Sequence, residues 1–405
     1  MVPLIAWRNV WRNRLRSLLV ALSIAVGLWG GTFFMAVSWG MYAHQLDTVI
    51  NDQVSHIQVH APRFRDDDDG RYGIPEADVL LDSIRTDSRV KAATERIVLP
   101  GVMVQSTANS AGVSVLGIDP KDEEKVTGLH DRLTDGTYFT GTKSAPMVMG
   151  AKLAQKLKID LRGRTVISFL NAQDSLVAMS FRVVGLYHSG NSALEEGTVY
   201  VRREDLARQM HLGTPANEIA VLLTDEKDLD AVQRKMQAMR PDMRVESWKE
   251  LSPELRLVVD SFSQYTYIFI GIILLALMFG IVNTMLMAVL ERTRELGMLM
   301  AIGMERRRVF AMVMWETVYM AVIGAPLGML LAWVSIQVVG RTGIDLTAFA
   351  AGLSSYGFDA VIHPALAANF YLEIAGLGIA AAILSAIYPA WKAVRMRPTE
   401  ALRKI

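Results

Sequence analysis

"ERTRELGMLMAIGMERRRVF", residues 291–310, lies between two long apolar runs and decides how the chain is organised. The segment begins with alternating charges, continues as a Leu/Met-rich stretch, and closes on three consecutive arginines after Gly303. Leu296, Leu299 and Met300 recur at helical spacing, and Gly303 follows where a glycine commonly ends a helix. We therefore predict a short amphipathic helix that connects two membrane-spanning helices.

Four long stretches carry at most one formal charge each, and each is long enough to cross a bilayer as a helix. They are residues 17–43, 261–290, 309–340 and 365–391. A 30-residue helix is roughly 45 Å long, against a hydrocarbon core of about 30 Å, so the first two helices should extend beyond the membrane. The first stretch exceeds the ~7–15 apolar residues of a cleaved signal peptide, so we interpret it as a retained anchor.

Basic residues gather in three segments, which set the expected orientation. The segments are residues 1–16, 291–308 and 392–405. The loop at 341–364, by contrast, has only Arg341 against two aspartates. Because lysine and arginine mark the cytoplasmic side, we predict a cytoplasmic amphipathic entry helix at 1–16, a cytoplasmic connector and a cytoplasmic tail. Residues 44–260 and 341–364 are then extracytoplasmic.

The 44–260 segment has the character of a globular α+β domain. "SHIQVHAPRF" (55–64) alternates as a half-buried strand does, and "PEADVLLDSIR" (75–85) has the apolar spacing of a helix. "RVKAATERIVLPGVMVQS" (89–106) then has the pattern of a strand, which completes a first strand–helix–strand set. Near the end, "EIAVLLT" (218–224), "DLDAVQRKMQAM" (228–239) and "MRVESW" (243–248) give the order strand, helix, strand. We predict that these two sets form one subdomain and that the strand-rich stretch between them forms a second one.

Composition excludes several classes of function. Lysine and arginine total 42 against 41 aspartates and glutamates, so no basic excess is available to neutralise nucleic-acid phosphates. The chain has no cysteine, and therefore no disulfide framework or thiolate chemistry. No Ser/His/Asp or paired-carboxylate arrangement stands out, so we predict no catalytic site, no cofactor in this chain and no nucleic-acid partner.

Three local motifs suggest ligands but have simpler interpretations. "GTYFTGTKS" (136–144) resembles a phosphate-binding loop, but its glycine-to-lysine spacing has one extra residue. "DDDD" (66–69) is most simply a solvated loop. His56 and His60 fall on one face of a predicted strand with no third ligand in sight. We interpret both histidines as structural and predict no metal site.

Two carboxylates fall inside the membrane spans. Such a group is costly in a bilayer and is by default a functional candidate. Glu316 lies about two turns from Arg308, close to the headgroups or to a neighbouring helix, and Glu373 can cap the outer end of the last span. Structural roles are favoured for both, and Glu316 is retained as a candidate intramembrane switch.

Aromatic side chains gather in the outer half of the first span and at the start of the second. Phe33 and Phe34 belong to the first span, and Tyr265 and Phe269 to the second. An interfacial aromatic belt with ordinary helix packing explains each of them singly. Together they form a candidate apolar substrate cleft that opens to the lipid.

Two interpretations of residues 291–308 remain open at this point. The segment is either an amphipathic connector that lies on the headgroups, held by Arg306–Arg308, or a lever that docks into a cytoplasmic motor. A family resemblance favours the lever. The segment resembles the coupling segment of the FtsX/MacB-type permeases of ABC transporters, with the pattern E-R-x-x-E-x-G-x-L-x-A-x-G. The matching residues are Glu291, Arg292, Glu295, Gly297, Leu299, Ala301 and Gly303. Met300 stands where a basic residue is frequent.

Two further segments are similar to the same family. "AWRNVWRNRLRSLLVALSIAVG" (6–27) resembles its entry helix and first membrane helix. "YPAWKAVRMRPTEALR" (388–403) resembles its closing motif. "SHIQVHAPRF" and "VVGLYHSGNSALEEGTVYV" (183–201) are most similar to the lipoprotein-releasing LolC/LolE branch.

The resemblance implies a permease of the bacterial inner membrane with four membrane helices and an outer domain of porter and Sabre-like subdomains. It implies pairing with a second copy or a paralogue, and with two cytoplasmic ATPases that bind ATP and Mg²⁺. It also assigns a set of residues to ATPase coupling: Glu291, Arg292, Glu295, Leu296, Gly297, Leu299 and Gly303.

The implied function is the release of lipoproteins or lipids from the inner membrane to a periplasmic carrier. Two alternatives within the family remain open, namely a MacB-like mechanical efflux subunit that works with an adaptor and an FtsX-like regulator of a cell-wall hydrolase. A membrane-anchored binding module without a motor is an alternative of a different class.

Overall fold

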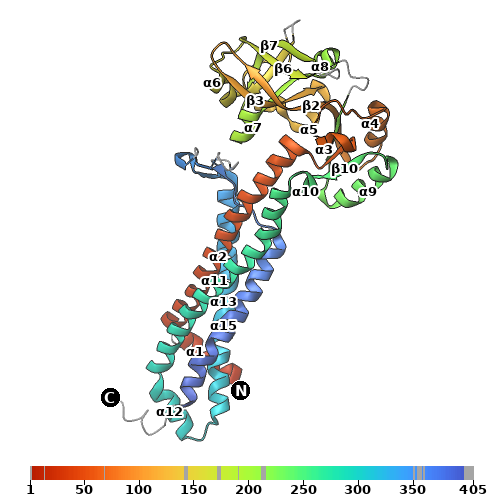
Figure 1. Cartoon of the computed structure of the whole chain (residues 1–405). Coiled ribbons are helices and arrows are strands. Elements are labelled where there is room, and N and C mark those ends of the chain that lie inside the picture. Colours follow the sequence, from red (N-terminus) through yellow and green to blue (C-terminus); the bar gives the residue numbers. More distant parts are fainter. Residues whose placement is uncertain are drawn as a thin grey trace. The chain divides into compact units, whose positions relative to one another are not determined.

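The computed structural model describes residues 2–12, 14–67, 69–140, 145–170, 175–189, 191–210, 216–349, 352–353, 358 and 361–395. The chain divides into two compact units, and many of their elements are labelled in Figure 1. The helical unit comprises residues 1–42, 259–345 and 361–405, and the α/β unit comprises residues 43–258 and 346–360.

Six helices lie wholly or mainly in the helical unit. They are α1 (Val2–Arg12), α2 (Arg14–Val49), α11 (Pro253–Glu291), α12 (Thr293–Ala301), α13 (Arg306–Thr342) and α15 (Ala368–Arg395). Helices α2, α11, α13 and α15 are long and apolar enough to cross a membrane, which confirms the four hydrophobic helices expected from the sequence. They run past the uncharged stretches at their ends, because backbone hydrogen bonding continues into charged flanks that a hydropathy criterion excludes.

Small residues bring α2 and α13 into backbone contact. A Cβ added at Gly324 of α13 would lie 2.6 Å from the carbonyl oxygen of Ala21, and one at Gly328 would lie 2.5 Å from that of Ala25. Both distances are far below van der Waals contact. The two glycines are four residues apart, as are the two alanines, so one turn of each helix repeats the contact. This is the small-xxx-small pattern by which membrane helices approach closely.

Larger side chains fill the contact between α2 and α11. The side chain of Leu277 in α11 lies against Gly27 of α2, and that of Ile273 lies against Gly31. Around these contacts one continuous core of buried apolar residues joins all six helices. Each helix therefore buries one apolar face and leaves another exposed, as expected of helices surrounded by hydrocarbon.

The first part of the α/β unit is a four-stranded antiparallel sheet covered by helices. Its elements, in chain order, are β1 (Ile57–His60), α4 (Ala77–Arg85), β2 (Val90–Gln105), β9 (Glu218–Leu223), α9 (Leu229–Met239) and β10 (Arg244–Ser247). The strand order is β10-β1-β9-β2. This is the ferredoxin-like βαββαβ arrangement, so the two strand–helix–strand sets of the sequence do share one sheet.

The second part is a closed ring of strands around its own core. Going round, β2 pairs with β3 (Ser110–Ile118), β3 with β8 (Thr198–Arg202), β8 with β5 (Pro146–Gly150), β5 with β7 (Leu176–Tyr187), β7 with β6 (Arg164–Leu170), and β6 with β2. Buried apolar residues such as Val104, Met147 and Phe181 fill the interior. Strand β2 belongs to both parts, and a bulge between Leu99 and Val102 bends it where it passes from one to the other.

The remaining elements are short. They are η1 (Ile50–Val54), α3 (Pro62–Asp67), α5 (Pro120–Thr127), η2 (Leu129–Arg132), β4 (Leu133–Gly136), α6 (Ala151–Leu157), α7 (Ser192–Gly197), α8 (Arg203–Met210), η3 (Glu226–Asp228), α10 (Trp248–Leu251), β11 (Ile344–Asp345), η4 (Thr347–Phe349) and β12 (Val361–Ile362). Strand β4 extends the ring along β7, and β11 and β12 form a separate two-stranded sheet.

A buried arginine joins β2, β9 and α5. Arg96 donates two hydrogen bonds to Glu123, at 2.6 and 2.9 Å, and one to Glu218, at 2.8 Å. Burial alone would lower the pKa of Arg96, but the two carboxylates outweigh it and hold that pKa above its ordinary value. Losing one partner of such a group typically costs about 3–5 kcal/mol, so the triad fixes α5 on the sheet.

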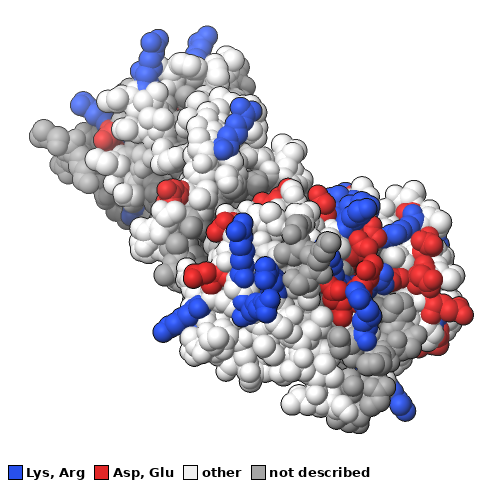
Figure 2. All heavy atoms as spheres, turned by 90° about the horizontal axis from the view of Figure 1, so that it is seen from above, with Lys and Arg blue, Asp and Glu red and all other residues white. Residues whose placement is uncertain are grey.

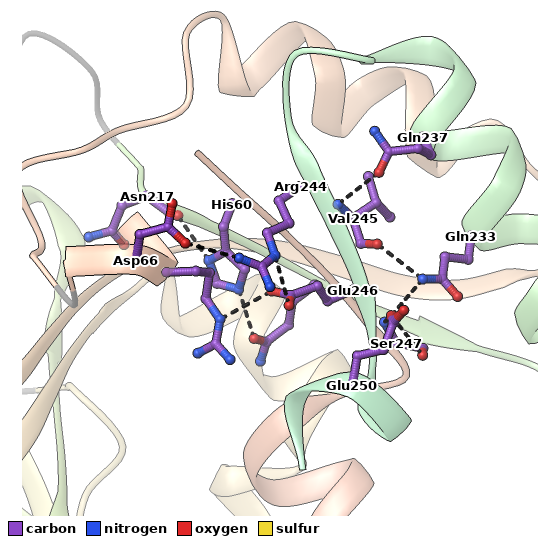
Figure 3. A network of polar contacts seen from close by, with 12 residues as sticks. His60, Asp66, Asn217, Gln233, Gln237, Arg244, Val245, Glu246, Ser247 and Glu250 are labelled. Atoms are coloured by element: carbon purple, nitrogen blue, oxygen red, sulfur yellow. Dashed lines mark hydrogen bonds and ion pairs between the residues drawn. The ribbon is translucent and has the colours of Figure 1, made fainter. Parts of the chain in front are cut away.

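The two histidines of β1 and its flank have protein partners. The ring of His60 lies 2.9 Å from the side-chain oxygen of Gln58 and 3.3 Å from the carbonyl oxygen of Asn217 (Figure 3). Burial lowers the pKa of His60. His56 accepts a hydrogen bond through Nδ1 from the backbone N–H of Leu223, at 3.1 Å. Within the described residues, no group of three or more His, Cys, Asp or Glu is placed to hold a metal ion.

Two motifs of the sequence fall partly outside the described residues. Asp68 of the "DDDD" run is one such position, and residues 141–144 of "GTYFTGTKS" are the others. Of the remaining acidic run, Asp69 pairs with Arg71 at 2.5 Å.

Charged side chains of both signs are mixed on the surface. Figure 2 shows lysine and arginine next to aspartate and glutamate on the face in view. Many form pairs in the α/β unit, such as Arg89 with Asp87 at 2.7 Å and Arg240 with Asp242 at 2.9 Å. The described residues on that face therefore form no continuous basic track.

We predict that Gly328→Ala destabilises the protein, because the added Cβ collides with backbone rather than with a movable side chain. Overpacking of this kind typically costs about 1–3 kcal/mol. Gly30→Ala is the matched control, since a Cβ at Gly30 meets nothing within 4 Å. The thermal midpoint of the full-length protein in detergent should fall for the first variant and stay level or rise for the second. Equal midpoints would show that the packing of α2 on α13 does not depend on this contact.

Candidate functional site

The break between α11 and α12 occupies a single residue. Helix α11 ends at Glu291 and α12 begins at Thr293, with Arg292 between them at φ −98° and ψ 13°. This conformation lies in the sparsely populated bridge region of backbone space. It turns the chain at Arg292, whose side chain reaches α12 and α13.

The other end of α12 is closed by Gly303. The N–H of Met304 donates to the carbonyl of Leu299 at 3.0 Å, and the N–H of Gly303 donates to the carbonyl of Met300 at 3.2 Å. Gly303 has φ +102°. These bonds form a Schellman motif, in which a glycine adopts positive φ and satisfies the last carbonyls of the helix. Helix α12 therefore ends just before Gly303, as the sequence predicts.

Helix α12 has one buried face and one exposed face. Leu296 and Gly297 are buried, and Leu299 and Met300 pack against the core of the helical unit. Met298 and Ile302 are 48% and 78% exposed. A further set of residues around the helix is also exposed: Glu291, Arg294, Glu295, Ala301, Gly303 and Glu305–Arg308. Two of the residues assigned to coupling by resemblance, Leu296 and Gly297, thus face the protein's own interior.

Five polar residues join α12 to α1 and α13, and we call them the α12 charge network. Arg292 donates through Nη1 to both carboxylate oxygens of Glu316 in α13, at 3.1 Å each. Its Nε donates to Oε2 of Glu295 at 3.1 Å, and Arg12 of α1 donates to the same oxygen at 2.6 Å. Asn9 of α1 donates to Oε1 of Glu316 at 2.8 Å. The network therefore contacts three helices at once.

The centre of the network is buried and its edge is exposed. The side chains of Arg292 and Glu316 are only 13% and 11% exposed, while those of Arg12 and Glu295 are about half exposed. Burial alone would lower the pKa of Arg292, but the charges of Glu316 and Glu295 outweigh it, so the pKa is raised. Burial acts to raise the pKa of Glu295, but its two arginine partners together have the larger, opposite effect. The pKa of Glu295 is therefore lowered. Arg292 and Glu295 are accordingly both charged at neutral pH.

Helix α1 is fixed to α13 by ring packing as well. Trp7 meets Tyr319 of α13 edge to face, with ring centroids 5.1 Å apart. Ala6 and Val10 are buried on the same side, whereas Leu4 and Trp11 are exposed. The amphipathic α1 therefore uses one face to hold α13 and presents the other outward.

The four residues of the predicted cleft do not form one site in this chain. Phe34 and Phe269 lie together, with ring centroids 5.6 Å apart, and each is 48% exposed. Tyr265 is exposed on the same helix as Phe269. Phe33 instead stacks on Trp29 and packs against a small cluster that includes residues of α13. The structure thus brings two of the four residues together, on an outward apolar face.

The closing motif of the sequence lies partly within the described residues. Pro389, Ala390 and Ala393 are buried on α15. Residues 398–402, which complete the resemblance, lie outside the described part of the chain. Glu373, the second carboxylate within a span, is exposed near the start of α15.

Asn9 and Arg12 are the site residues that sequence reasoning missed. They lie 307 and 283 residues from their partners Glu316 and Glu295. One signal pointed toward them, because a carboxylate inside a membrane helix requires a partner. The identity of that partner depends on which helices are neighbours, and a single sequence does not give it.

Two family profiles match the chain. The MacB-like periplasmic core domain matches residues 17–239, which is more than half of the chain. The FtsX-like permease C-terminal region matches residues 267–398, from within α11 through α15. The first match covers α2 and most of the α/β unit, and the second covers α12 and the charge network except for Asn9 and Arg12.

Curated proteins of two kinds are similar to the chain. The macrolide export ATP-binding/permease protein MacB of Escherichia coli is 26% identical over 316 residues, covering 74% of this chain and 44% of that protein. The lipoprotein-releasing system transmembrane protein LolC of Xylella fastidiosa is 21% identical over 297 residues, covering 71% of this chain and 72% of that protein. The solved periplasmic region of MacB from Actinobacillus actinomycetemcomitans aligns with a TM-score of 0.34 at 12% identity, covering 54% of this chain and 98% of that one.

The matches to MacB proteins cover less than half of those proteins' length. The two profiles, by contrast, meet in one chain in the order in which the structure has its parts, an α/β unit inserted after the first long helix and three long helices after it. On this evidence the chain belongs to the family of FtsX-like permeases that carry a MacB-like periplasmic core domain.

Proposed function

We propose that the chain is the permease subunit of an ATP-driven ABC transporter and that α12 receives the movement of a cytoplasmic ATPase dimer. The observation that carries the proposal is the α12 charge network. A helix that docks on a motor must be joined to the elements it moves. Helix α12 is joined to α13 through the buried pair of Arg292 with Glu316, and to α1 through the half-exposed pair of Arg12 with Glu295. The ATP and Mg²⁺ would be bound by the partner ATPase.

The exposed face of α12 suits a protein partner. Met298 and Ile302 present apolar surface, and the exposed residues near them in the sequence are charged, among them Arg294, Glu295 and Glu305–Arg308. Apolar residues with a charged rim are the usual composition of a protein interface. A push on this face would reach α13 through Arg292 and Glu316, and α1 through Glu295 and Arg12.

The substrate we propose is a lipoprotein or another acylated molecule in the outer leaflet of the bacterial inner membrane. The exposed pair Phe34 and Phe269 supports this, because it offers aromatic surface to acyl chains on the side of the bundle. The match to LolC supports it too, since that match extends over most of both chains. A second copy or a paralogue would supply the opposite wall, and a periplasmic carrier would receive the substrate. Mechanical efflux with an adaptor, and regulation of a cell-wall hydrolase, are the outcomes that the tests below separate from this proposal.

The proposal places both termini and α12 in the cytoplasm and the α/β unit outside, as the distribution of basic residues predicts. The chain has no cysteine, so single cysteines can report orientation. Asp135→Cys, in the α/β unit, should react with a membrane-impermeant maleimide once the outer membrane is permeabilised. Arg307→Cys should react only after the inner membrane is opened. Labelling of both cysteines before the inner membrane is opened would contradict this topology.

We predict that Glu316→Gln uncouples the transporter without detaching the ATPase, because it removes the charge that holds Arg292 while leaving the exposed face of α12 unchanged. Breaking a buried ion pair typically costs about 3–5 kcal/mol, so the thermal midpoint should fall as well. The measurements are co-purification of the ATPase and substrate-stimulated ATP hydrolysis in reconstituted vesicles.

Two variants serve as controls for this experiment. Glu373→Gln removes the other carboxylate within a span, which is exposed and outside the network, and should leave coupling intact. The double variant Arg292→Glu with Glu316→Arg exchanges the two charges and should recover part of the lost coupling. Full coupling in Glu316→Gln would show that α12 acts on the membrane helices by another route.

The nature of the substrate is tested by a photo-reactive amino acid at Phe269. We expect it to capture an acylated protein in the absence of nucleotide and to lose it when ATP closes the ATPase dimer. The control position is Leu384 of α15, which is similarly exposed and lies outside the aromatic pair. Identical adducts of bulk phospholipid at both positions, unchanged by ATP, would favour the efflux or regulatory alternatives.

A further inference from the structure

A cavity of about 240 Å³ lies between α1, the start of α2 and the middle of α13. Its walls are apolar side chains from all three helices: Trp11, Leu18, Leu22, Ile323 and Leu327. An apolar cavity of about 150 Å³ already holds a molecule of the size of benzene. The space is therefore large enough for a length of hydrocarbon chain.

The cavity is open rather than enclosed. Leu18, Leu22 and Leu327 on its rim are about half exposed. They belong to helices that are long and apolar enough to cross a membrane. The molecules that such a rim meets in a bilayer are lipid acyl chains.

One end of the cavity is positively charged. Arg14, the first residue of α2, borders the cavity and is exposed. No ion pair or hydrogen bond joins its side chain to another of the described residues. The other polar side chain in the wall is Ser17, whose hydroxyl already donates to the carbonyl of Val10 at 2.8 Å. None of the described residues that line this cavity is acidic.

A second cavity on the other side of Arg14 has a different character. It measures about 490 Å³ and is lined by Arg12 and Glu291 as well as by Arg14. Its lining places a carboxylate beside two arginines, whereas the described lining of the α1–α2–α13 cavity contains no carboxylate. The α1–α2–α13 cavity thus combines an apolar chamber with an arginine and has no carboxylate among its described lining residues.

We propose that the α1–α2–α13 cavity binds one acyl chain of an anionic glycerophospholipid, with the lipid phosphate at Arg14. The acyl chain would bury its methylene groups against Leu22, Ile323 and Leu327, and each buried methylene group contributes favourably to the binding free energy. The guanidinium would attract the phosphate of a lipid with a net negative headgroup more strongly than that of a zwitterionic lipid. This site goes beyond the transport function proposed above, and it does not depend on it.

The lipid would act as a wedge that fixes α1. Trp11 of α1 forms one wall of the cavity, and Asn9 and Arg12 on the same helix hold Glu316 and Glu295. A bound acyl chain would therefore contact α1 through Trp11 and stabilise its position beside α13. The charge network would be firmest when the site is filled.

The test compares two lipids with identical acyl chains, phosphatidylglycerol and phosphatidylcholine. Each is titrated into the delipidated full-length protein, and binding is followed by native mass spectrometry. We expect phosphatidylglycerol to bind about fivefold more tightly, the effect of one basic residue near a lipid surface. Arg14→Gln should abolish this preference, whereas Arg307→Gln, an exposed arginine at the same end of the bundle, should retain it. Leu22→Trp, which fills the cavity from its exposed rim, should weaken both lipids.

A photo-reactive acyl chain on phosphatidylglycerol locates the site. Its adducts should fall on peptides that contain Trp11, Leu22 or Leu327, and Leu22→Trp should remove them. Equal binding of the two lipids, or equal behaviour of the Arg14 and Arg307 variants, would overturn the proposed headgroup contact. Adducts spread evenly over the four long helices would overturn the site itself and leave the cavity as part of the general lipid-facing surface.

Discussion

The ion pair between Arg292 and Glu316 is the contact on which the proposed working of this permease depends. A carboxylate buried in an apolar helix is tolerated only when a cation reaches it. Here the cation comes from the one residue that separates α11 from α12. The same arginine therefore compensates the buried negative charge of Glu316 and fixes the angle at which α12 leaves α11. One contact thus contributes both to the stability of the bundle and to the position of α12.

The edge of the charge network differs from its centre in what it can do. The pair between Arg12 and Glu295 is about half exposed, and exposed pairs contribute little to stability and weaken with salt. It can open and close at small cost, whereas the pair between Arg292 and Glu316 cannot. Helix α1 is accordingly the element whose attachment to α12 is easiest to change.

Local features of the site could be predicted from the sequence, and long-range ones could not. The end of α12 at Gly303 and the burial of Leu296 follow from periodicity and glycine chemistry, which involve only a few neighbouring residues. Glu316 could be identified because a carboxylate within an apolar membrane span carries a free-energy cost that the sequence alone reveals. Its partner Asn9 was not, since the contact depends on the packing of α1 against α13. Phe33 and Phe34 were grouped as neighbours, but successive helical residues point about 100° apart, and the two rings have different partners.

The same division holds for the α/β unit. The two strand–helix–strand sets were recognised from alternation and length, and they form one sheet. The closed ring was not predicted, because it requires the parallel pairs of β3 with β8 and β5 with β7, which join strands separated by long connections. The bulge at Leu99 to Val102 shares β2 between the two parts, and alternation alone does not indicate it.

The two kinds of contact made by α2 have opposite mechanical properties. Toward α13 it is held backbone against backbone, at Ala21 and Ala25, and neither side has a torsion angle that can yield. Toward α11 it is held by the side chains of Leu277 and Ile273, which can change rotamer and let the helices slide or roll. Helices α2 and α13 therefore move together as one rigid pair, and the contact between α2 and α11 is where helices of the bundle can slide past each other.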